Sequence, residues 1–244
     1  MRETTFERAA GGTPPLAARA PHARGVPGGN SAPAAGCEPR VRRLTARDAP
    51  EAARLASEVF RENRFYRSAI GFDAECFDAY WTTFIPLAVS DPHALSLGVE
   101  RHGRLVGILV LAFEGFPSRP RALRFMAALA RAIGPLPLLR YARFVRHYES
   151  AMRRPHPERA LEARGLWLLV SREAGCAGLG ARLVRAGWDE AARSGRTIST
   201  GFVDAGDRRL LLFYRRLGFD IGTPFSIGAV AAATIVRRAP EAPC

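Results

Sequence analysis

A glycine-bearing segment in the second half of the chain combines residue types that could do chemistry. Residues 166–170 form an apolar run typical of a buried strand, and residues 171–181 follow as a loop that opens a helix. Unpaired backbone N–H groups and the positive end of the helix dipole lie at such a helix start. Gly178 and Gly180 have no side chain to keep an oxyanion away from that backbone. The segment predicts a phosphate or pyrophosphate site, with a tight strand-to-helix turn as the alternative.

Several other kinds of site are excluded by the same residues. The loop lacks the Gly-Lys-Ser/Thr ending of a P-loop, and its glycines do not have the spacing of a dinucleotide fold. The four cysteines are widely separated, with no histidine at metal-ligand spacing: Cys37, Cys76, Cys176 and Cys244. We therefore expect free thiols and no metal site.

The elements that must position the loop alternate between strands and helices. Apolar runs and alternation predict strands at 41–44, 94–100, 105–114, 166–170, 196–203, 219–227 and 229–237. Helical spacing predicts helices after Thr45 and Asp48, over 73–87, twice within 116–164, after Gly180 and over 207–217. This order predicts an α/β domain with a mixed sheet.

A second motif, residues 207–219, follows the loop by about 30 residues and reads Asp-Arg-Arg-Leu-Leu-Leu-Phe-Tyr-Arg-Arg-Leu-Gly-Phe. The two motifs in this order resemble the GNAT superfamily of acyl-coenzyme A-dependent N-acyltransferases. The resemblance covers residues 40 to about 237 and is closest to the branch that includes puromycin N-acetyltransferase. It implies the GNAT fold, a mixed and mostly antiparallel central sheet flanked by helices, with a helical insert after the third strand. His156 stands where that branch ends its insert with a His.

The resemblance also implies a set of site residues and acetyl-coenzyme A as co-substrate. The backbone of the strand end would pair with the pantetheine arm, and the loop amides would hold the pyrophosphate. Tyr214 would protonate the leaving thiolate, although its spacing with Leu210 and Leu217 equally suits a core aromatic. The implied cofactor-binding residues are Leu169, Val170, Ser171, Gly175, Cys176, Ala177, Gly178, Leu179, Gly180, Ala181, Asp207 and Phe213.

Four residues depart from the family pattern at these positions. Gly175 replaces a Gln or Arg, Cys176 a common Gly, Ala177 a basic or polar residue, and Asp207 a frequent Asn. The departures predict weaker coenzyme A affinity or a catalytically inactive member. A thiol at a helix start is also more acidic and could be redox-sensitive, unless Cys176 is merely a small residue tolerated there.

An acceptor amine must be deprotonated before it can attack, because an ammonium ion has no lone pair. Glu114, at the end of the second hairpin strand, is the first candidate base, and Glu162, just before the buried strand, is the second. Either could instead be a solvated surface acid, and a water relay could replace both.

The chain is strongly basic: its 244 residues include 36 Lys and Arg, all of them Arg, against 23 acidic residues, a formal charge of +13. Such a charge suits a nucleic acid or an anionic surface, but GC-rich coding bias also enriches arginine. Residues 116–164 hold eleven arginines and three glutamates, which is +8 of that total. Those arginines form a solvated helix face, a wall of an acceptor site, or a membrane or nucleic-acid contact. No apolar run is long enough to predict a membrane span.

These observations divide the chain into a disordered tail over 1–38, an acetyltransferase domain over 39–238 with its Arg-rich insert at 116–160, and a flexible end over 239–244. We expect an N-acetyltransferase that moves an acetyl group from acetyl-coenzyme A to a small-molecule or peptide amine within a ternary complex. The alternatives are a non-catalytic coenzyme A-binding module and a basic nucleic-acid or membrane-surface protein. A cytoplasmic monomer or homodimer is expected.

Overall fold

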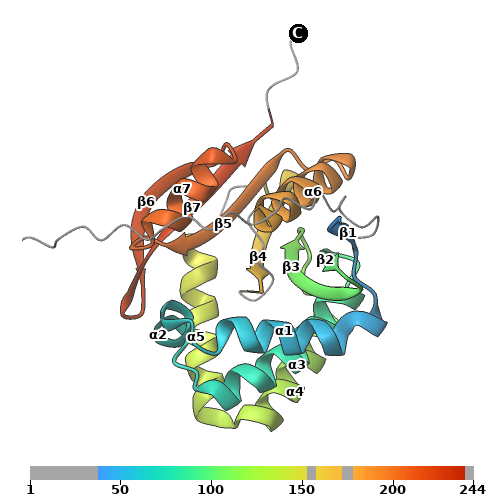
Figure 1. Cartoon of the computed structure of the whole chain (residues 1–244). Helices are drawn as coiled ribbons and strands as arrows, with labels where there is room; N and C mark the ends of the chain where they lie inside the picture. The colour runs from blue at the N-terminus through green and yellow to red at the C-terminus, as the bar shows by residue number, and fades with distance from the viewer. Residues whose placement is uncertain (1–37, 153–157, 172–177, 240–244) are drawn as a thin grey trace, which may run out of the picture. The chain divides into compact units, whose positions relative to one another are not determined.

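A computed structural model describes residues 38–152, 158–171 and 178–239, all within one compact unit. Its core is a seven-stranded sheet in the order β1-β2-β3-β4-β5-β7-β6 (Figure 1). Neighbouring strands are antiparallel except for β4 and β5, which run parallel. The strands are β1 (Arg40–Arg43), β2 (Ala94–Arg101), β3 (Arg104–Ala112), β4 (Glu162–Val170), β5 (Ile198–Asp204), β6 (Asp220–Ile227) and β7 (Val230–Arg238).

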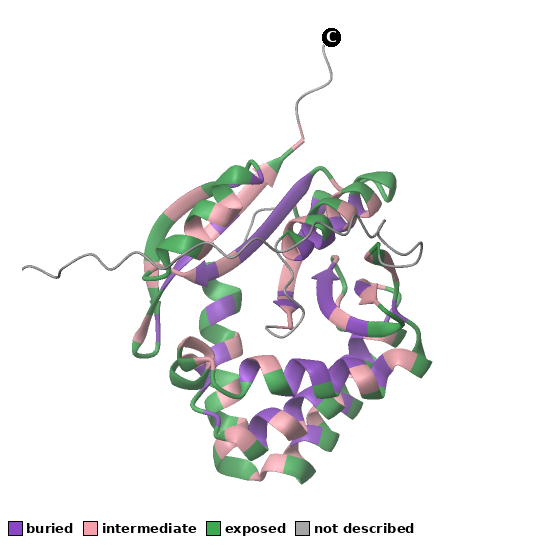
Figure 2. Cartoon of the chain, in the orientation of Figure 1, coloured by how far each residue is buried: buried purple, intermediate pink, exposed green. Residues whose placement is uncertain are grey.

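Helices cover both faces of this sheet. The α-helices are α1 (Ala49–Phe60), α2 (Arg64–Ile70), α3 (Ala74–Ser90), α4 (Arg119–Ile133), α5 (Pro135–Ala151), α6 (Leu179–Arg193) and α7 (Arg208–Arg216), and two 3-10 turns are η1 (Ala46–Asp48) and η2 (Glu158–Leu161). Alternate residues of β3 point to opposite faces: Ile108 packs in the cluster with α1 and α3, whereas Leu109 packs in the cluster with α6. Buried residues gather on the strands, α1 and α3, while α4 and α5 are largely exposed or half-buried (Figure 2).

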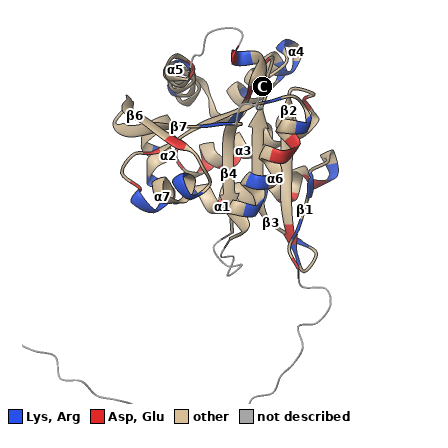
Figure 3. Ribbon diagram, turned by 90° about the horizontal axis from the view of Figure 1, so that it is seen from above, with Lys and Arg blue, Asp and Glu red and all other residues tan. Residues whose placement is uncertain are grey.

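The segment between β3 and β4 forms the two helices α4 and α5, which Gly134 separates. Asp91 fixes the entrance to α4, because its Oδ2 accepts hydrogen bonds from the backbone N–H and the hydroxyl of Ser118. Six of the seven arginines of these two helices are exposed, and Arg121 is half-buried; blue segments mark the arginines of α4 in Figure 3. The exposed ones are Arg119, Arg124, Arg131, Arg140, Arg143 and Arg146. The solvated-face interpretation of the arginine excess fits this arrangement.

The expected fold class is confirmed, and the differences concern element ends. β4 begins at Glu162 rather than at residue 166, and α3 continues through Pro86 to Ser90. The sequence reasoning missed α2, which Asn63 caps by accepting from the Tyr66 N–H. The tail, most of the C-terminal end and His156 fall outside the described residues, so the predicted domain limits stay predictions.

Candidate functional site

Strands β4 and β5 separate after a short parallel ladder, and this separation is the centre of the candidate site. Only Glu162 to Arg164 pair with β5, opposite Ile198 to Thr200, whereas β4 continues to Val170 beside β3 (Figure 1). A Cβ on Gly165 would lie 3.2 Å from the Thr200 carbonyl oxygen. A glycine at this position therefore allows β4 and β5 to stay close together just before they separate. Beyond it, the register with β3 shifts and leaves Leu166 as an extra residue, a β-bulge that bends the strand.

Part of the β4 backbone beyond the bulge faces away from β3. The Ser171 N–H donates to the Val106 carbonyl at 2.8 Å, and residues of an antiparallel ladder alternate between bonded and non-bonded pairs. Leu169 therefore bonds to β3, whereas Leu168 and Val170 turn their backbone groups to the other edge. Of the three strand-end residues in the sequence prediction, Val170 is the one whose backbone faces the space between β4 and β5.

The start of α6 carries the described part of the predicted anion loop. Gly178 caps the helix with φ of +90°, a conformation that side-chain-bearing residues rarely adopt, and a Cβ there would meet no atom of the described residues within 4 Å. Leu179 is buried and Ala181 partly buried, so both serve the packing of the helix. A Cβ on Gly180 would lie 3.5 Å from the Phe213 ring. Three predicted loop residues, Gly175, Cys176 and Ala177, lie outside the described residues.

Helix α7 brings Phe213 and Tyr214 into the hydrophobic cluster that includes Ala181 at the start of α6, and Asp207 begins α7. Asp207 caps the helix because its Oδ1 accepts from the Leu210 N–H at 3.0 Å, which is the task an Asn would perform. The half-buried Tyr214 ring packs edge-on against Phe219, with ring centroids 5.3 Å apart. Burial raises the pKa of Tyr214, so its phenol stays protonated at neutral pH.

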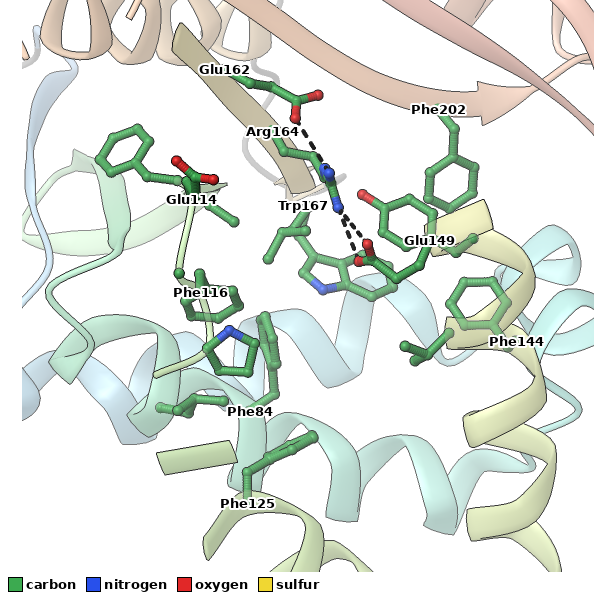
Figure 4. A pocket seen from close by; sticks show the side chains of 18 of the residues that line it. Phe84, Glu114, Phe116, Phe125, Phe144, Glu149, Glu162, Arg164, Trp167 and Phe202 are labelled. Carbon is green, nitrogen blue, oxygen red and sulfur yellow. Dashed lines mark hydrogen bonds and ion pairs between the residues drawn. The ribbon is translucent and has the colours of Figure 1, made fainter. Parts of the chain in front are cut away.

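A cavity of about 530 Å³ lies beside the paired end of β4 and extends to α3, α4 and α5 (Figure 4). Of the twenty-one described residues that line it, ten are aromatic and five are charged. The aromatic residues are Tyr80, Phe84, Phe113, Phe116, Phe125, Tyr141, Phe144, Tyr148, Trp167 and Phe202. The charged ones are Glu114, Glu149, Arg159, Glu162 and Arg164.

Both candidate bases line this cavity, but their environments differ. Glu162 is buried: the Thr200 hydroxyl donates to its Oε1 at 2.5 Å, and Arg164 donates to its Oε2 at 3.3 Å. Arg164 also makes two hydrogen bonds to the exposed Glu149, at 2.9 and 3.1 Å. Glu114 is exposed at the end of β3. The carboxylate beside the separation of β4 and β5 is thus Glu162, the second choice from sequence.

Two tyrosines that the sequence reasoning did not single out belong to the site. The Tyr66 ring of α2 contacts Trp167 on β4 and Phe202 on β5, with centroids 4.8 and 6.1 Å away. Burial raises the pKa of Tyr66, and the nearby Tyr214 phenol adds to that rise. Tyr148 is buried, and its hydroxyl has no hydrogen-bond partner among the described residues. The sequence signals for α2 are its N-cap Asn63 and its C-cap Gly71, which flank the aromatic pair at 65–66.

Two other kinds of site were searched for in the described part of the chain. No group of three or more His, Cys, Asp or Glu residues there could hold a metal ion. No helix within those residues is long and apolar enough to cross a membrane.

Solved acetyltransferases share this fold. The GNAT-family acetyltransferase of Streptococcus pneumoniae matches with a TM-score of 0.53 and 14% identity, over 83% of this chain and 99% of that one. The PaiA N-acetyltransferase of Thermoplasma acidophilum, in complex with coenzyme A, gives 0.50 and 14% over 82% and 99%. The yncA protein of Salmonella typhimurium, with its cofactor acetyl-CoA, gives 0.51 and 12% over 84% and 96%. No protein-family model and no curated protein matches the sequence. The predicted GNAT fold is therefore confirmed.

Proposed function

We propose that this chain transfers an acetyl group from acetyl-coenzyme A to a primary amine, directly and within a ternary complex. The observation that carries the proposal is the β4 edge, where Leu168 and Val170 turn backbone groups towards a space that β5 has left. An extended amide-bearing arm can add to such an edge as a strand does. The coenzyme A and acetyl-CoA in two fold neighbours, PaiA and yncA, support this assignment.

The residues around the separated strands suit an acyl donor whose non-reacting part carries phosphate groups. Gly178 leaves room for an anion at the start of α6, where backbone N–H groups gather. The bulge at Leu166 interrupts the ladder with β3, and a strand N–H released there could stabilise an oxyanion. The thioester supplies the activated acetyl group. The residues present therefore fit acetyl-coenzyme A.

The reaction needs one proton acceptor and one proton donor. The amine nitrogen forms a bond to the acetyl carbon, the bond from that carbon to sulfur breaks, and the amine loses a proton while the sulfur gains one. We assign the acceptor to Glu162, because its carboxylate is held at the point where β4 and β5 separate. Glu114 is the second candidate. Tyr214 is the proposed donor, because it stands at the tyrosine position of the motif at 207–219 and a phenol is protonated at neutral pH.

Calorimetric titration with acetyl-coenzyme A, followed by thiol release with a panel of primary amines, tests the proposal. Binding together with amine-dependent thiol release supports it, and no binding up to millimolar concentration refutes it. A non-catalytic coenzyme A-binding module is the second candidate, favoured by the packing of Tyr214 against Phe219. That module would bind coenzyme A without releasing thiol for any amine. The branch that includes puromycin N-acetyltransferase is also part of our proposal and rests on the insert between β3 and β4.

A further inference from the structure

The cavity beside β4 has two chemically different ends. At one end the carboxylates of Glu162 and Glu149 share Arg164, and at the other end the rings of Phe84 and Phe125 gather (Figure 4). Two further charged residues, Glu114 and Arg159, line the cavity, and Figure 4 places Glu114 on the same upper side as Glu162, away from the rings of Phe84 and Phe125. A molecule that fills the cavity therefore meets these labelled charged groups on one side and rings on the other. It must be apolar along the rest of its length, because charged groups lose hydration among rings without gaining partners.

The apolar end is built from rings that hold one another in place. Tyr80 stacks on Phe84 at 5.3 Å and 10°, and Phe125 meets both rings edge-on at 6.2 Å. Tyr141 contacts Tyr80 and Phe125 from α5. Ring faces and edges in such an arrangement favour an aromatic guest over an aliphatic one of equal size. The insert helices thus supply ring contacts to the cavity, while their arginines remain outside it.

A buried polar group marks the carboxylate end. The Tyr148 side chain is 7% exposed, lines the cavity, and has no hydrogen-bond partner for its hydroxyl among the described residues. The Arg164 guanidinium lies over its ring, 5.7 Å from the centroid, and acts on the phenol electrostatically, without a hydrogen bond of good geometry to its oxygen. Buried hydroxyls in folded proteins are almost always paired. A hydrogen-bond donor on a bound molecule would give the Tyr148 hydroxyl oxygen a partner.

We propose that the acceptor is an arylalkylamine, a primary amine with one ammonium group on a single aromatic ring system. Its ring packs among Phe84, Phe125 and Phe144, and its nitrogen lies at the Glu162 end and donates to the Tyr148 hydroxyl. Arg164 is engaged by two glutamates, which disfavours acceptors that also carry a carboxylate. The identity as acceptor rests on the proposed function; the binding of the amine does not.

Calorimetry on the full chain tests the proposal, with and without saturating coenzyme A to allow for ordered binding. The probes are tryptamine and 2-phenylethylamine, compared with 2-cyclohexylethylamine, spermidine and an Ala-Ala-Ala peptide. We expect the aromatic amines to bind at least tenfold more tightly than spermidine or the peptide, and more tightly than the cyclohexyl analogue. Tighter binding of any comparison compound, or no binding of the aromatic amines under either condition, would overturn the proposal.

Three variants sharpen the result. Tyr148→Phe removes only the unpaired hydroxyl, so it should weaken aromatic amine binding two- to tenfold without lowering the melting temperature. Phe125→Leu should also weaken binding, whereas Phe65→Leu, an aromatic residue outside the cavity lining, should not. Unchanged binding in Tyr148→Phe contradicts the assignment. Aromatic amine binding without thiol release would refute the transferase function alone, and thiol release with spermidine alone would refute this inference alone.

Discussion

Replacing Glu162 by glutamine tests the proposed base at its most specific point. The glutamine amide has almost the same shape and can still accept from the Thr200 hydroxyl, but it carries no charge and cannot take a proton. Its NH₂ group would also face Arg164, a donor opposite a donor. The perturbation therefore removes proton acceptance and one charge-assisted hydrogen bond while leaving the packing of the site intact.

The structure sets the size of both effects. The Glu162 side chain is 5% exposed, so losing a hydrogen bond to its charge should lower the free energy of unfolding by about 1.5–3 kcal/mol. A domain stable by roughly 5–15 kcal/mol remains folded after such a loss. Loss of a general base lowers turnover by roughly 10²- to 10⁴-fold. Catalysis should therefore fall far more than stability does.

Glu149→Gln is the matched control, because it removes a carboxylate from the same guanidinium. The Glu149 side chain is 54% exposed, and an exposed pair contributes only about 0–1 kcal/mol. Thiol release at saturating amine, with acetyl-coenzyme A affinity measured separately, separates the two variants. Glu162→Gln should lose turnover and keep its cofactor affinity, whereas Glu149→Gln should keep both. A Glu162→Gln enzyme with wild-type turnover would refute the assignment.

Three further predictions concern the donor, the helix start and acid stability. Tyr214→Phe should slow thiol release and leave coenzyme A affinity unchanged; equal turnover in a kinetic assay would make Tyr214 a packing residue. Gly178→Ala should lower stability by about 1–2 kcal/mol, because its φ is +90°, while Gly180→Ala should cost less in the same urea titration; equal losses would contradict this. The hydrogen-bonded Arg42 guanidinium holds the pKa of Asp48 below its usual range, so this stabilisation is complete above about pH 4 and is lost as pH falls through the folded-state pKa. Asp48→Asn should thus destabilise at pH 7 by about 1.5–3 kcal/mol and progressively less below pH 4, and a difference independent of pH in urea unfolding would refute it.

The fold was predictable because its signals are local. The strand-loop-helix order at the glycine segment and the capping residues of several helices each depend on neighbours within a few positions. Thr45 and Asp48 illustrate this: their spacing predicts a helix start, and η1 begins there, with the Thr45 backbone N–H donating to the Asp48 carboxylate at 2.6 Å. Such pairs depend only on residues close together in the sequence, so they can be identified before the fold is known.

The site was harder to predict because it depends on contacts between distant residues. Nothing near Tyr66 indicates that its ring will contact both Trp167 and Phe202, because α2 reaches β4 and β5 only after the sheet has formed. Tyr148 reads as one more aromatic residue on an amphipathic helix, and only the folded chain shows that its buried hydroxyl lacks a hydrogen bond of good geometry within the described residues. Glu162 ranked second for the same reason: its partner Thr200 lies 38 positions away.

The helices α4 and α5 carry many of the chain's arginines and also form part of the cavity wall. Helical periodicity forces α4 and α5 to have two sides, and in this chain one side carries exposed arginines while the other carries Phe125 and Phe144. A cavity wall of arginine would favour anionic acceptors, whereas a wall of rings beside Glu162 favours a cation with an aromatic body. The charge of +13 therefore describes the outer surface, and the chemistry of the acceptor follows from the inner side, where three glutamates outnumber two arginines.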